Sequence, residues 1–428
     1  MNSSAIAKMK IPIGTASSVL SRVSMAAPDK ILGLTEKFNV DRNPNKINLT
    51  VGIYKDEAGI VTTFPSVSRA QAMLDSHLDL NNDLSYLPIT GSQEYQNNVL
   101  NFLFRESSDG NELLDENRIT FVQTLSGTGA LAVVSKLLST FVSKTVWIPN
   151  PSWANHANVF KWNGFKQIKY YTYYENGKLN VDKWLSDLQS SYTAEKDDEN
   201  WPPCIVLHAC CHNPTGVDPT LEQWQRILPV IHDMGIIPIV DMAYQGMESG
   251  NLVQDAYLLR MCLEYEWENG LYLCQSFAKN MGLYGERVGS LSVVVPPNPK
   301  DLKARLDSQL KKIVRGIYSS PPGYGSRVAN LVLSNPDLKR QWFVDVKAMS
   351  DRLWGVRNLM HERLNWPNLV NFETQHGMFY YTGLSPQQVQ KLQDQYGIYL
   401  TQDGRMSLSG VNDGNIDYLC NSLLDVVE

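Results

Sequence analysis

Three side chains that could carry out covalent chemistry follow one short apolar run. Residues 271–274 are typical of a buried strand, and Ser276, Lys279 and Arg287 come after them on one connecting segment. A lysine that loses water beside a buried strand has a lowered pKa, so its amine becomes a nucleophile. The hydroxyl and the planar guanidinium suit a phosphate group. The segment therefore predicts a reactive amine beside an anion site.

Two kinds of enzyme use such a segment. A reactive amine beside a phosphate clamp is what a pyridoxal-phosphate enzyme needs. Ser-x-x-Lys is also the nucleophile motif of serine β-lactamases and penicillin-binding proteins, which carry Ser-Asp-Asn and Lys-Thr-Gly motifs as well. Neither of those two motifs occurs in the 428 residues. A solvated surface lysine is the third interpretation, so the segment alone leaves the chemistry open.

The turn at Ser126, Gly127 and Thr128 is a second candidate anion site. It follows an apolar run and opens a helical pattern, so its backbone N–H groups and the helix dipole would attract a phosphate. A dinucleotide-binding loop would need a third glycine, which residues 130–132 do not supply. A simple helix cap at Ser126 or Thr128 is the alternative.

Asp241 and two aromatic residues could bind a planar ring. Asp241 ends a run so apolar that an unpaired carboxylate there would be costly, and a protonated pyridine nitrogen would be a suitable partner. Tyr244 follows closely, and Trp153 could stack on the same ring. The alternatives are a strand-end aspartate that caps the next turn and a tryptophan of the core.

Histidines and cysteines near residue 210 raise the question of a metal. His208, His212 and the adjacent Cys210 and Cys211 are residue types that bind metals. The turn of residues 213–216 that follows is typical of a loop, so we expect no metal ion. His156, further upstream, is interpreted as a structural histidine.

Two arginines have surroundings that suit carboxylates. Arg315 precedes a proline-rich turn at residues 319–322, and Arg405 lies in a strand-like stretch. Fixed geometry favours the planar, two-pronged binding of a carboxylate by a guanidinium. Each arginine could also be a surface charge.

The candidates lie near the ends of strands in an alternating α/β pattern. Short β-rich runs alternate with helical patterns between residues 118 and 295, which predicts a mainly parallel sheet with helices on both faces. Ligands then bind beyond the carboxyl ends of the strands. A long helical pattern and two short strands after Pro336 predict a second, smaller α+β domain. The expected strands are residues 119–122, 145–148, 205–209, 236–240, 271–274, 290–295, 377–382 and 405–409, and the expected helices are 130–142, 221–234 and 338–364.

Composition narrows the possible partners and the compartment. A net charge of −6 gives no basic surface for nucleic acid, and no run approaches the ~18 apolar residues of a membrane span. The six cysteines lie mostly in apolar contexts, which indicates reduced thiols. The stretch before Asp29 is basic, serine-rich and free of acidic residues, which is typical of a mitochondrial transit peptide. A disordered tail is the alternative.

Together, these motifs resemble the aspartate aminotransferases, a family of fold-type I pyridoxal-phosphate enzymes. The likeness runs from about Pro28 to the C-terminus and extends to fungal mitochondrial members in particular. The blocks that carry it are residues 86–91, 126–131, 151–156, 212–216, 241–246 and 276–289.

The resemblance implies a role for each cofactor-binding candidate. Lys279 would bind pyridoxal 5′-phosphate covalently and later move a proton at the substrate. Asp241 would hold the protonated pyridine nitrogen, with His156 behind it, while Tyr244 would hydrogen-bond the ring hydroxyl and Trp153 would stack on the ring. The residues implied to hold the phosphate are Ser126, Gly127, Thr128, Ser276, Arg287 and, from a neighbouring subunit, Tyr86.

The resemblance also implies how the substrate binds and what the reaction is. Arg405, Asn213 and the backbone at Gly52 would bind the α-carboxylate, with Asn213 and Trp153 contacting cofactor and substrate alike. Arg315 of a neighbouring subunit would bind the distal carboxylate. The implied reaction is L-aspartate + 2-oxoglutarate ⇌ oxaloacetate + L-glutamate by a ping-pong mechanism. An aromatic-amino-acid aminotransferase on the same scaffold is the second choice.

The implied architecture has a large domain, with a mainly parallel seven-stranded sheet, and a smaller α+β domain. The expected divisions are a transit peptide at residues 1–27, an N-terminal arm and part of the small domain at 28–61, the large cofactor-binding domain at 62–348 and the small C-terminal domain at 349–428. The expected assembly is a homodimer with shared active sites, without a nucleic-acid or membrane partner. The expected location is the mitochondrial matrix, with the cytoplasm as the alternative.

Overall fold

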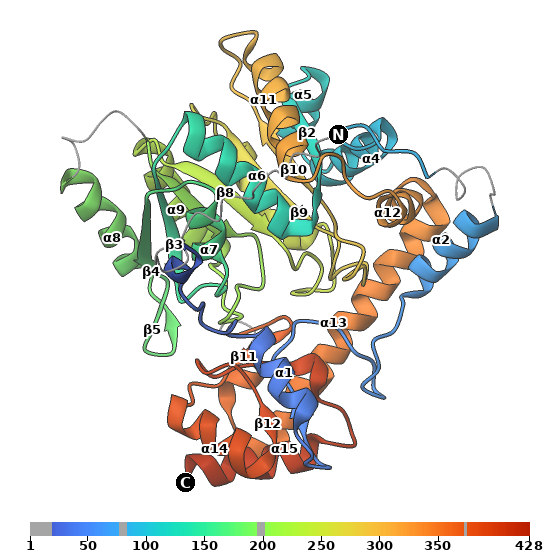
Figure 1. Cartoon of the computed structure of the whole chain (residues 1–428), viewed down its shortest axis with the longest axis vertical. Coiled ribbons are helices and arrows are strands. Elements are labelled where there is room, and N and C mark those ends of the chain that lie inside the picture. The colour runs from blue at the N-terminus through green and yellow to red at the C-terminus, as the bar shows by residue number, and fades with distance from the viewer. Residues whose placement is uncertain (1–18, 77–83, 195–201, 372–374) are drawn as a thin grey trace, which may run out of the picture.

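A seven-stranded sheet forms the centre of the larger lobe (Figure 1). The structure is a computed structural model that describes residues 19–76, 84–194, 202–371 and 375–428. In spatial order the strands are β2 (Ile119–Leu125), β10 (Val288–Val294), β9 (Leu271–Ser276), β8 (Ile237–Met242), β7 (Cys204–His208), β3 (Thr145–Asn150) and β4 (Gln167–Thr172). All neighbours pair in parallel except β10, which is antiparallel to both β2 and β9.

The direction of β10 brings three chain segments together. Val288, its first residue, pairs with Leu125 at the carboxyl end of β2, and the next residue, Gly289, pairs with Ser276 at the carboxyl end of β9. Residues that follow β2 and β9 therefore meet the residue that precedes β10. This arrangement places Ser126, Ser276 and Arg287 beside one another, although they are distant in the sequence.

Helices cover both faces of the sheet, because its strands bury side chains on both sides. One face is covered by α6 (Ser126–Phe141), α7 (His156–Trp162) and α11 (Leu302–Ile317), and the other by α4 (Gln93–Phe104), α8 (Val181–Ala194), α9 (Leu221–Asp233) and α12 (Tyr324–Ser334). Successive residues of β7 alternate between the two cores: Val206 packs with the first group, and Ile205 and Leu207 pack with the second. This period of two is what a strand buried on both faces requires. Three further helices pack around these layers, α2 (Pro65–Ser76), α5 (Ser108–Asp115) and α10 (Tyr257–Leu263).

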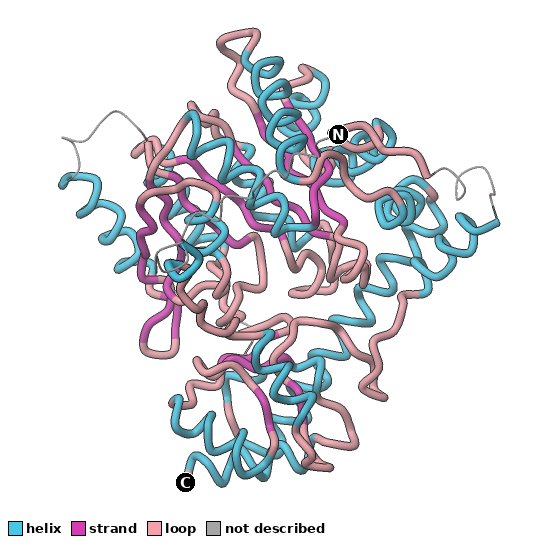
Figure 2. The backbone as a smooth tube through the Cα atoms, in the orientation of Figure 1, coloured by secondary structure: helices cyan, strands magenta, loops and turns pink. Residues whose placement is uncertain are grey.

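A smaller lobe contains the C-terminal part of the chain together with an early segment (Figure 1). Its strands form two small pairs, β1 (Ile47–Asn48) parallel to β12 (Ile398–Tyr399) and β11 (Phe379–Tyr381) antiparallel to β13 (Arg405–Ser407). Its helices are α1 (Leu32–Val40), α14 (Pro386–Tyr396) and α15 (Ile416–Val427). Figure 2 shows these short strands apart from the large group of strands in the other lobe.

One long helix, α13 (Pro336–Leu364), runs between the two lobes (Figure 1). It begins after Asn335, whose side chain accepts hydrogen bonds from the backbone N–H groups of Asp337 and Leu338 at 2.9 and 3.2 Å. Pro336 fits the first turn because the backbone N–H that it lacks would have no helical partner there. The helix ends at Asn365, which has a left-handed backbone with φ of 54°.

The remaining ordered elements are short. A hairpin of β5 (Tyr174–Glu175) and β6 (Lys178–Leu179) follows β4. The described residues also form four 3₁₀ turns, η1 (Val19–Arg22), η2 (Gln254–Ala256), η3 (Pro367–Leu369) and η4 (Leu408–Gly410). Among the helices in the described ranges, none is both long and apolar enough to cross a membrane.

The structure confirms the α/β class and the mainly parallel seven-stranded sheet, and it adds to that sheet one strand that the sequence pattern did not reveal. That strand is β4, which lies at the edge of the sheet and has several partly exposed side chains. The predicted boundary between residues 348 and 349 falls inside α13, and the domain divisions stay predictions. Most of the predicted transit peptide, residues 1–18, lies outside the described residues.

Candidate active site

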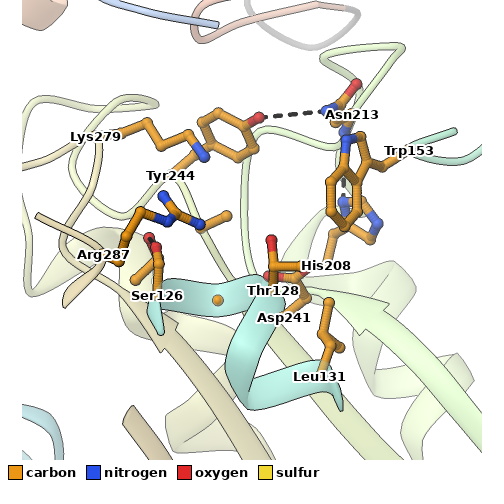
Figure 3. A pocket seen from close by; sticks show the side chains of 13 residues that line it. Ser126, Thr128, Leu131, Trp153, His208, Asn213, Asp241, Tyr244, Lys279 and Arg287 are labelled. Carbon is orange, nitrogen blue, oxygen red and sulfur yellow. Dashed lines mark hydrogen bonds between the residues drawn. The ribbon is translucent and has the colours of Figure 1, made fainter. Parts of the chain in front are cut away.

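A cavity lies at the carboxyl ends of the central strands (Figure 3). This edge of the sheet is where ligands bind in open α/β folds. The cavity gathers side chains that follow β2, β3, β7, β8 and β9. Its lining consists of Ser126, Gly127, Thr128, Leu131, Trp153, His208, Asn213, Asp241, Ala243, Tyr244, Ser276, Lys279 and Arg287.

One end of the cavity is built to hold an anion. Ser126 begins α6 with φ of 60°, and its backbone N–H donates to the carbonyl oxygen of Arg287 at 3.1 Å. Its hydroxyl lies 2.8 Å from that of Ser276. Gly289 makes this approach possible, since a Cβ there would lie 2.9 Å from the Cα of Ser126. Two hydroxyls, a guanidinium and a helix N-terminus at one point favour a phosphate group.

Arg287 is held partly out of water beside this anion site. Its side chain donates to the carbonyl oxygen of Tyr284 at 3.0 Å, and its backbone is left-handed with φ of 54°. Burial lowers the pKa of Arg287, because the charged form loses hydration. An anion bound here would stabilise the guanidinium charge of Arg287 in place of the lost water.

Asp241 provides a buried negative charge in the middle of the cavity. Burial by itself would raise its pKa, but the hydrogen bond with His156 and the nearby charge of Lys279 help to hold the pKa below the usual value. Nε2 of His156 lies 3.0 Å from Oδ2 of Asp241, and Nδ1 of His156 lies 2.8 Å from the hydroxyl of Ser152. Asp241 is therefore available as an ionised partner for a cationic ring nitrogen.

Lys279 is buried and its amine lies in the polar cavity. Burial lowers its pKa to about 8, the charge of Asp241 opposes this shift, and Arg287 adds to it. A larger fraction of the amine is therefore uncharged near neutral pH than for an exposed lysine. The ammonium nitrogen lies 5.1 Å from the centre of the Tyr244 ring. Lys279 thus has the properties of a nucleophilic amine.

Arg405 and Asn213 form a preassembled polar group beside the cavity. One guanidinium nitrogen of Arg405 donates to Oδ1 of Asn213 at 3.0 Å, and another donates to the carbonyl oxygen of Thr50. The amide nitrogen of Asn213 donates to the hydroxyl of Tyr244 at 3.3 Å (Figure 3). Burial lowers the pKa of Arg405, and its Nε has no hydrogen-bond partner among the described residues. This fixed cation suits a carboxylate.

The comparison with family models decides which family this fold and this cavity represent. The family described as "Aminotransferase class I and II" matches residues 44–423, a span that contains all the cavity-lining residues. The chain belongs to this family. Its membership brings the fold-type I architecture expected from the sequence and excludes the serine-hydrolase interpretation of Ser276.

Relatives of this aminotransferase have closely similar lengths. The chain is 60% identical over 424 residues to a protein of Saccharomyces cerevisiae named "Aspartate aminotransferase, mitochondrial", covering 95% of this chain and 94% of that protein. Among solved structures, the cytoplasmic aspartate aminotransferase of the same yeast has a TM-score of 0.89 at 34% identity, covering 96% and 99% of the two chains. An aromatic-amino-acid aminotransferase from Burkholderia pseudomallei, covalently bound to pyridoxal phosphate, has a TM-score of 0.86 at 35% identity, covering 96% and 100%.

Two residues expected at the site lie away from the cavity of this aminotransferase chain. Tyr86 is 92% exposed, and Arg315 is an exposed residue of α11 that donates to the hydroxyl of Ser319. Gly52 is closer, beside the Arg405 group: a Cβ at Gly52 would lie 2.9 Å from the ring of Phe379, which stacks under the Arg405 guanidinium at 4.4 Å. All other predicted site residues line the cavity or contact a residue that does.

Sequence reasoning missed two contributors to the site. His208 lines the cavity, and its ring centre lies 5.2 Å from that of His156. Burial and the neighbouring His212 and His156 lower the pKa of His208 well below its usual value, so it is neutral. Its place at the end of the expected strand at residues 205–209 was the available signal. The second contributor that was missed is the carbonyl oxygen of Thr50. A backbone group leaves no signal in the sequence.

Proposed function

We propose that this aminotransferase transfers the amino group of L-aspartate to 2-oxoglutarate, giving oxaloacetate and L-glutamate, with pyridoxal 5′-phosphate as its cofactor. The observation that carries the proposal is that one cavity combines the buried amine of Lys279, the carboxylate of Asp241 and the adjacent Arg405–Asn213 group. The 60% identity to a mitochondrial aspartate aminotransferase supports the choice of substrate.

The residues of the cavity fit the proposed cofactor. Ser126, Ser276 and Arg287 converge where a phosphate would lie, and the ionised Asp241 is suited to a protonated pyridine nitrogen. Trp153 is half-buried in the cavity wall, where its indole can stack on a planar ring. Pyridoxal phosphate supplies an aldehyde that accepts an amine and a pyridinium ring that withdraws electrons from the carbon bearing the amino group.

The protein's own groups would carry out the remaining tasks. Lys279 supplies the amine that attaches the cofactor and, once released, carries the proton to or from the substrate α-carbon. Arg405 binds and orients the α-carboxylate, and Asn213 fixes the guanidinium in place. Asp241 keeps its ring-nitrogen partner protonated, and His156 orients Asp241 through their 3.0 Å contact. Tyr244 places a neutral phenol next to the ring, since burial raises its pKa above the usual range.

The proposed assembly is a homodimer in which each chain completes the neighbouring site. The exposure of Tyr86 and Arg315 supports this assembly, because both side chains lie away from the cavity of their own chain. They could reach a phosphate or a carboxylate only in the cavity of a neighbouring chain. In the dimer, Arg315 would bind the distal carboxylate of the substrate. Two arginines on opposite sides of the reacting carbon select four- and five-carbon dicarboxylates.

The proposed location is the mitochondrial matrix. Support comes from the acid-free, serine-rich N-terminal stretch and from the name of the S. cerevisiae relative. A fusion of residues 1–30 to a fluorescent protein should enter mitochondria. A fusion that stays in the cytoplasm would contradict the proposed location while leaving the proposed reaction untouched.

Substrate preference is the direct test of the proposed reaction. We expect kcat/KM to be much higher for aspartate than for phenylalanine, with 2-oxoglutarate as the acceptor in both assays. The structural likeness to an aromatic-amino-acid aminotransferase favours that activity as the second candidate. A higher kcat/KM for phenylalanine would replace the first proposal with the second.

A further inference from the structure

A buried group of metal-binding side chains lies outside the cavity, where the loop that carries Asn213 meets the segment that leads to β11. Cys211, Asp218 and His376 each place one ligand atom within 4.8 Å of the others. Their exposed fractions are 2, 7 and 4%. A second triad, Cys210, Glu248 and Asp255, meets the same condition.

We propose that Cys211, Asp218 and His376 form a binding site for one divalent ion of the zinc class, coordinated by Sγ, Oδ2 and Nε2. Thiolate, carboxylate and imidazole are the three ligand types that Zn²⁺ uses in proteins. Nε2 of His376 lies 3.5 Å from Oδ2 of Asp218. In a tetrahedral site with bonds of about 2.0–2.3 Å, neighbouring ligand atoms are separated by roughly this distance. The fourth position would be filled by water or by Cys210.

Neighbouring groups are placed to orient these ligands. Nδ1 of His376 lies 3.6 Å from Oε1 of Glu248, so a small adjustment gives the carboxylate–histidine–metal arrangement common in zinc proteins. Asp218 accepts hydrogen bonds from the backbone N–H groups of His212, at 2.9 Å, and Cys211.

The charges of this region support a divalent cation. Three carboxyl groups gather in this region: Asp218 and Asp255 are buried, Glu248 is largely buried, and the buried Arg357 lies beside them. The guanidinium of Arg357 is directed at the carbonyl oxygens of Gly377 and Phe379, at 3.1 and 2.6 Å. A divalent cation would relieve the mutual repulsion of these three carboxyl groups when they ionise. In addition, Oε2 of Glu248 is buried and has no hydrogen-bond partner among the described residues.

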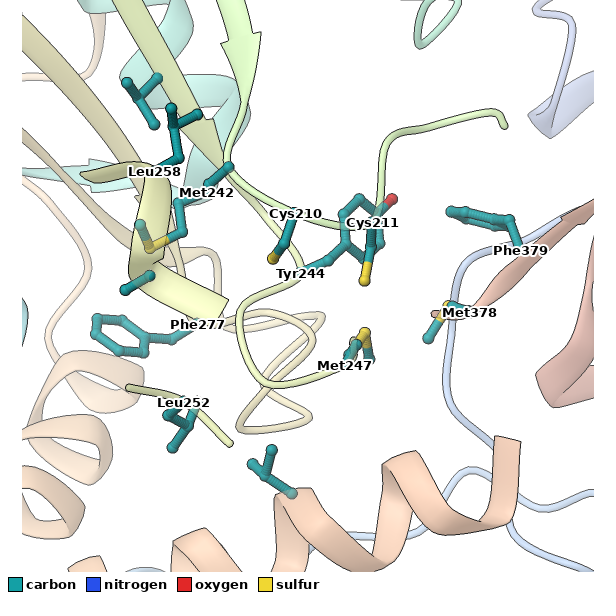
Figure 4. Close-up of a cluster of buried hydrophobic side chains, with 14 of the residues drawn as sticks. Cys210, Cys211, Met242, Tyr244, Met247, Leu252, Leu258, Phe277, Met378 and Phe379 are labelled. Carbon is teal, nitrogen blue, oxygen red and sulfur yellow. The ribbon is translucent and has the colours of Figure 1, made fainter. Parts of the chain in front are cut away.

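The site joins two segments that are distant in the sequence. Cys211 and Asp218 belong to the loop after β7, and His376 belongs to the segment that leads to β11. Figure 4 shows Cys211 on the part of its loop that faces Met378 and Phe379. The two segments touch closely: the backbone N–H of His376 donates to the carbonyl oxygen of Gly216 at 2.8 Å, and a Cβ at Gly377 would lie 2.5 Å from Sγ of Cys211. A bound ion would fix the loop of Asn213 to the smaller lobe.

Equilibrium dialysis of the holoenzyme against Zn²⁺, after removal of metals with a chelator, tests the proposal. We expect one ion per chain. His376→Gln and Cys211→Ser should each weaken binding by at least 100-fold, and Glu248→Gln by about 10- to 100-fold. Zn²⁺ should raise the Tm of the wild-type protein but not that of His376→Gln. The visible absorbance of bound pyridoxal phosphate reports that each variant is folded, and His376→Gln is decisive if Cys211→Ser does not fold.

Matched controls separate this site from other histidines and cysteines. Cys420→Ser changes another buried cysteine, and His232→Gln changes a histidine of α9, so both should bind Zn²⁺ as the wild type does. His156, His208 and Asp241 form another possible ligand group, which lies at the cavity. Zinc binding that is lost in His208→Gln and kept in His376→Gln would overturn the proposal. A wild-type protein that binds no Zn²⁺ at micromolar concentrations of the free ion would also overturn it. Neither result bears on the aminotransferase activity, which is measured separately.

Discussion

The two ends of the substrate and cofactor cavity are built in different ways. Most of the anion end is assembled within one chain, because the antiparallel strand β10 brings Arg287 to Ser126 and Ser276 at the rim of the sheet, and only Tyr86 is expected from a neighbouring subunit. At the proposed substrate end, Arg405 is fixed by Asn213, whereas Arg315 lies exposed on α11, away from the cavity. If the proposed dimer is correct, the cofactor depends mainly on residues of one chain, whereas recognition of a dicarboxylate depends on both chains.

Replacing Lys279 by alanine should have the largest effect on activity. The amine is the nucleophile of the proposed reaction, so we expect transamination to fall by on the order of 10⁵-fold or more. Cofactor should still bind without a covalent link, because the anion end does not involve this amine. Steady-state kinetics and the cofactor absorbance after gel filtration measure the two effects, with Lys169→Ala as the control. Retained activity in Lys279→Ala would contradict the assignment of the nucleophile.

Arg315→Asp should have the next largest effect, and only on dicarboxylates. Loss of a buried ionic contact costs about 3–5 kcal/mol, so kcat/KM for aspartate should fall by about 10²- to 10⁴-fold. The value for phenylalanine should stay nearly unchanged. Arg405→Lys is the matched contrast, because the lost two-pronged contact with the α-carboxylate should weaken both substrates. An equal loss for the two substrates in Arg315→Asp would refute its role at the distal carboxylate.

Mixed dimers separate a shared site from a remote effect of Arg315. A chain with Lys279→Ala still supplies an intact Arg315, and a chain with Arg315→Asp still supplies an intact Lys279. If the sites are shared, dimers that combine the two inactive chains should regain one active site of two. Activity measured after mixing, partial unfolding and refolding tests this expectation. Mixed dimers that stay inactive would place Arg315 outside the neighbouring site.

The pH dependence of cofactor attachment should show a moderate effect. Only the uncharged amine attacks an aldehyde, and the pKa of Lys279 is lowered by burial to about 8. The rate at which the cofactor-free protein takes up pyridoxal phosphate should therefore rise with pH and level off above about pH 8. Below that value the protonated amine predominates, and the rate should fall about tenfold for each pH unit. A midpoint near that of an exposed lysine would show that the amine is not desolvated.

Tyr244→Phe should have the smallest effect of the series. The change removes the hydroxyl that accepts the 3.3 Å hydrogen bond from Asn213. A hydrogen bond of this kind contributes about 1 kcal/mol, so we expect roughly a fivefold loss in kcat/KM. Both aspartate and phenylalanine should be affected, because Asn213 also positions Arg405. A loss confined to aspartate would link Tyr244 to the distal carboxylate instead.

The anion end could be read from the sequence more fully than the substrate end. Ser126 and Lys279 follow strands that are strongly apolar, and the rule that ligands lie at the carboxyl ends of such strands placed them together. The edge strand β4 escaped notice because its half-exposed residues lack the continuous apolar pattern of the inner strands. The antiparallel direction of β10 was equally hidden, since a run of buried residues does not record which way a strand points.

Contacts between distant segments account for the rest of what the sequence did not predict. Nothing in the local pattern around His376 links it to Cys211, because their proximity depends on how the two lobes meet. The carbonyl oxygen of Thr50, which fixes Arg405, belongs to the backbone and carries no residue signature. Arg315 and Tyr86 were assigned to a neighbouring subunit by resemblance alone, and their exposure leaves that assignment as a prediction.

The long helix α13 can convert a small change of angle at one lobe into a large displacement at the other. Its 29 residues span about 43 Å and run from the lobe that holds the sheet to the lobe that holds Arg405. A tilt of about 3° at one end would displace the other end by ~2 Å over this length. A displacement of this size is enough to separate the two partners of a hydrogen bond. Substitutions at the sheet end of α13, far from any ligand, can therefore change how firmly the α-carboxylate is held.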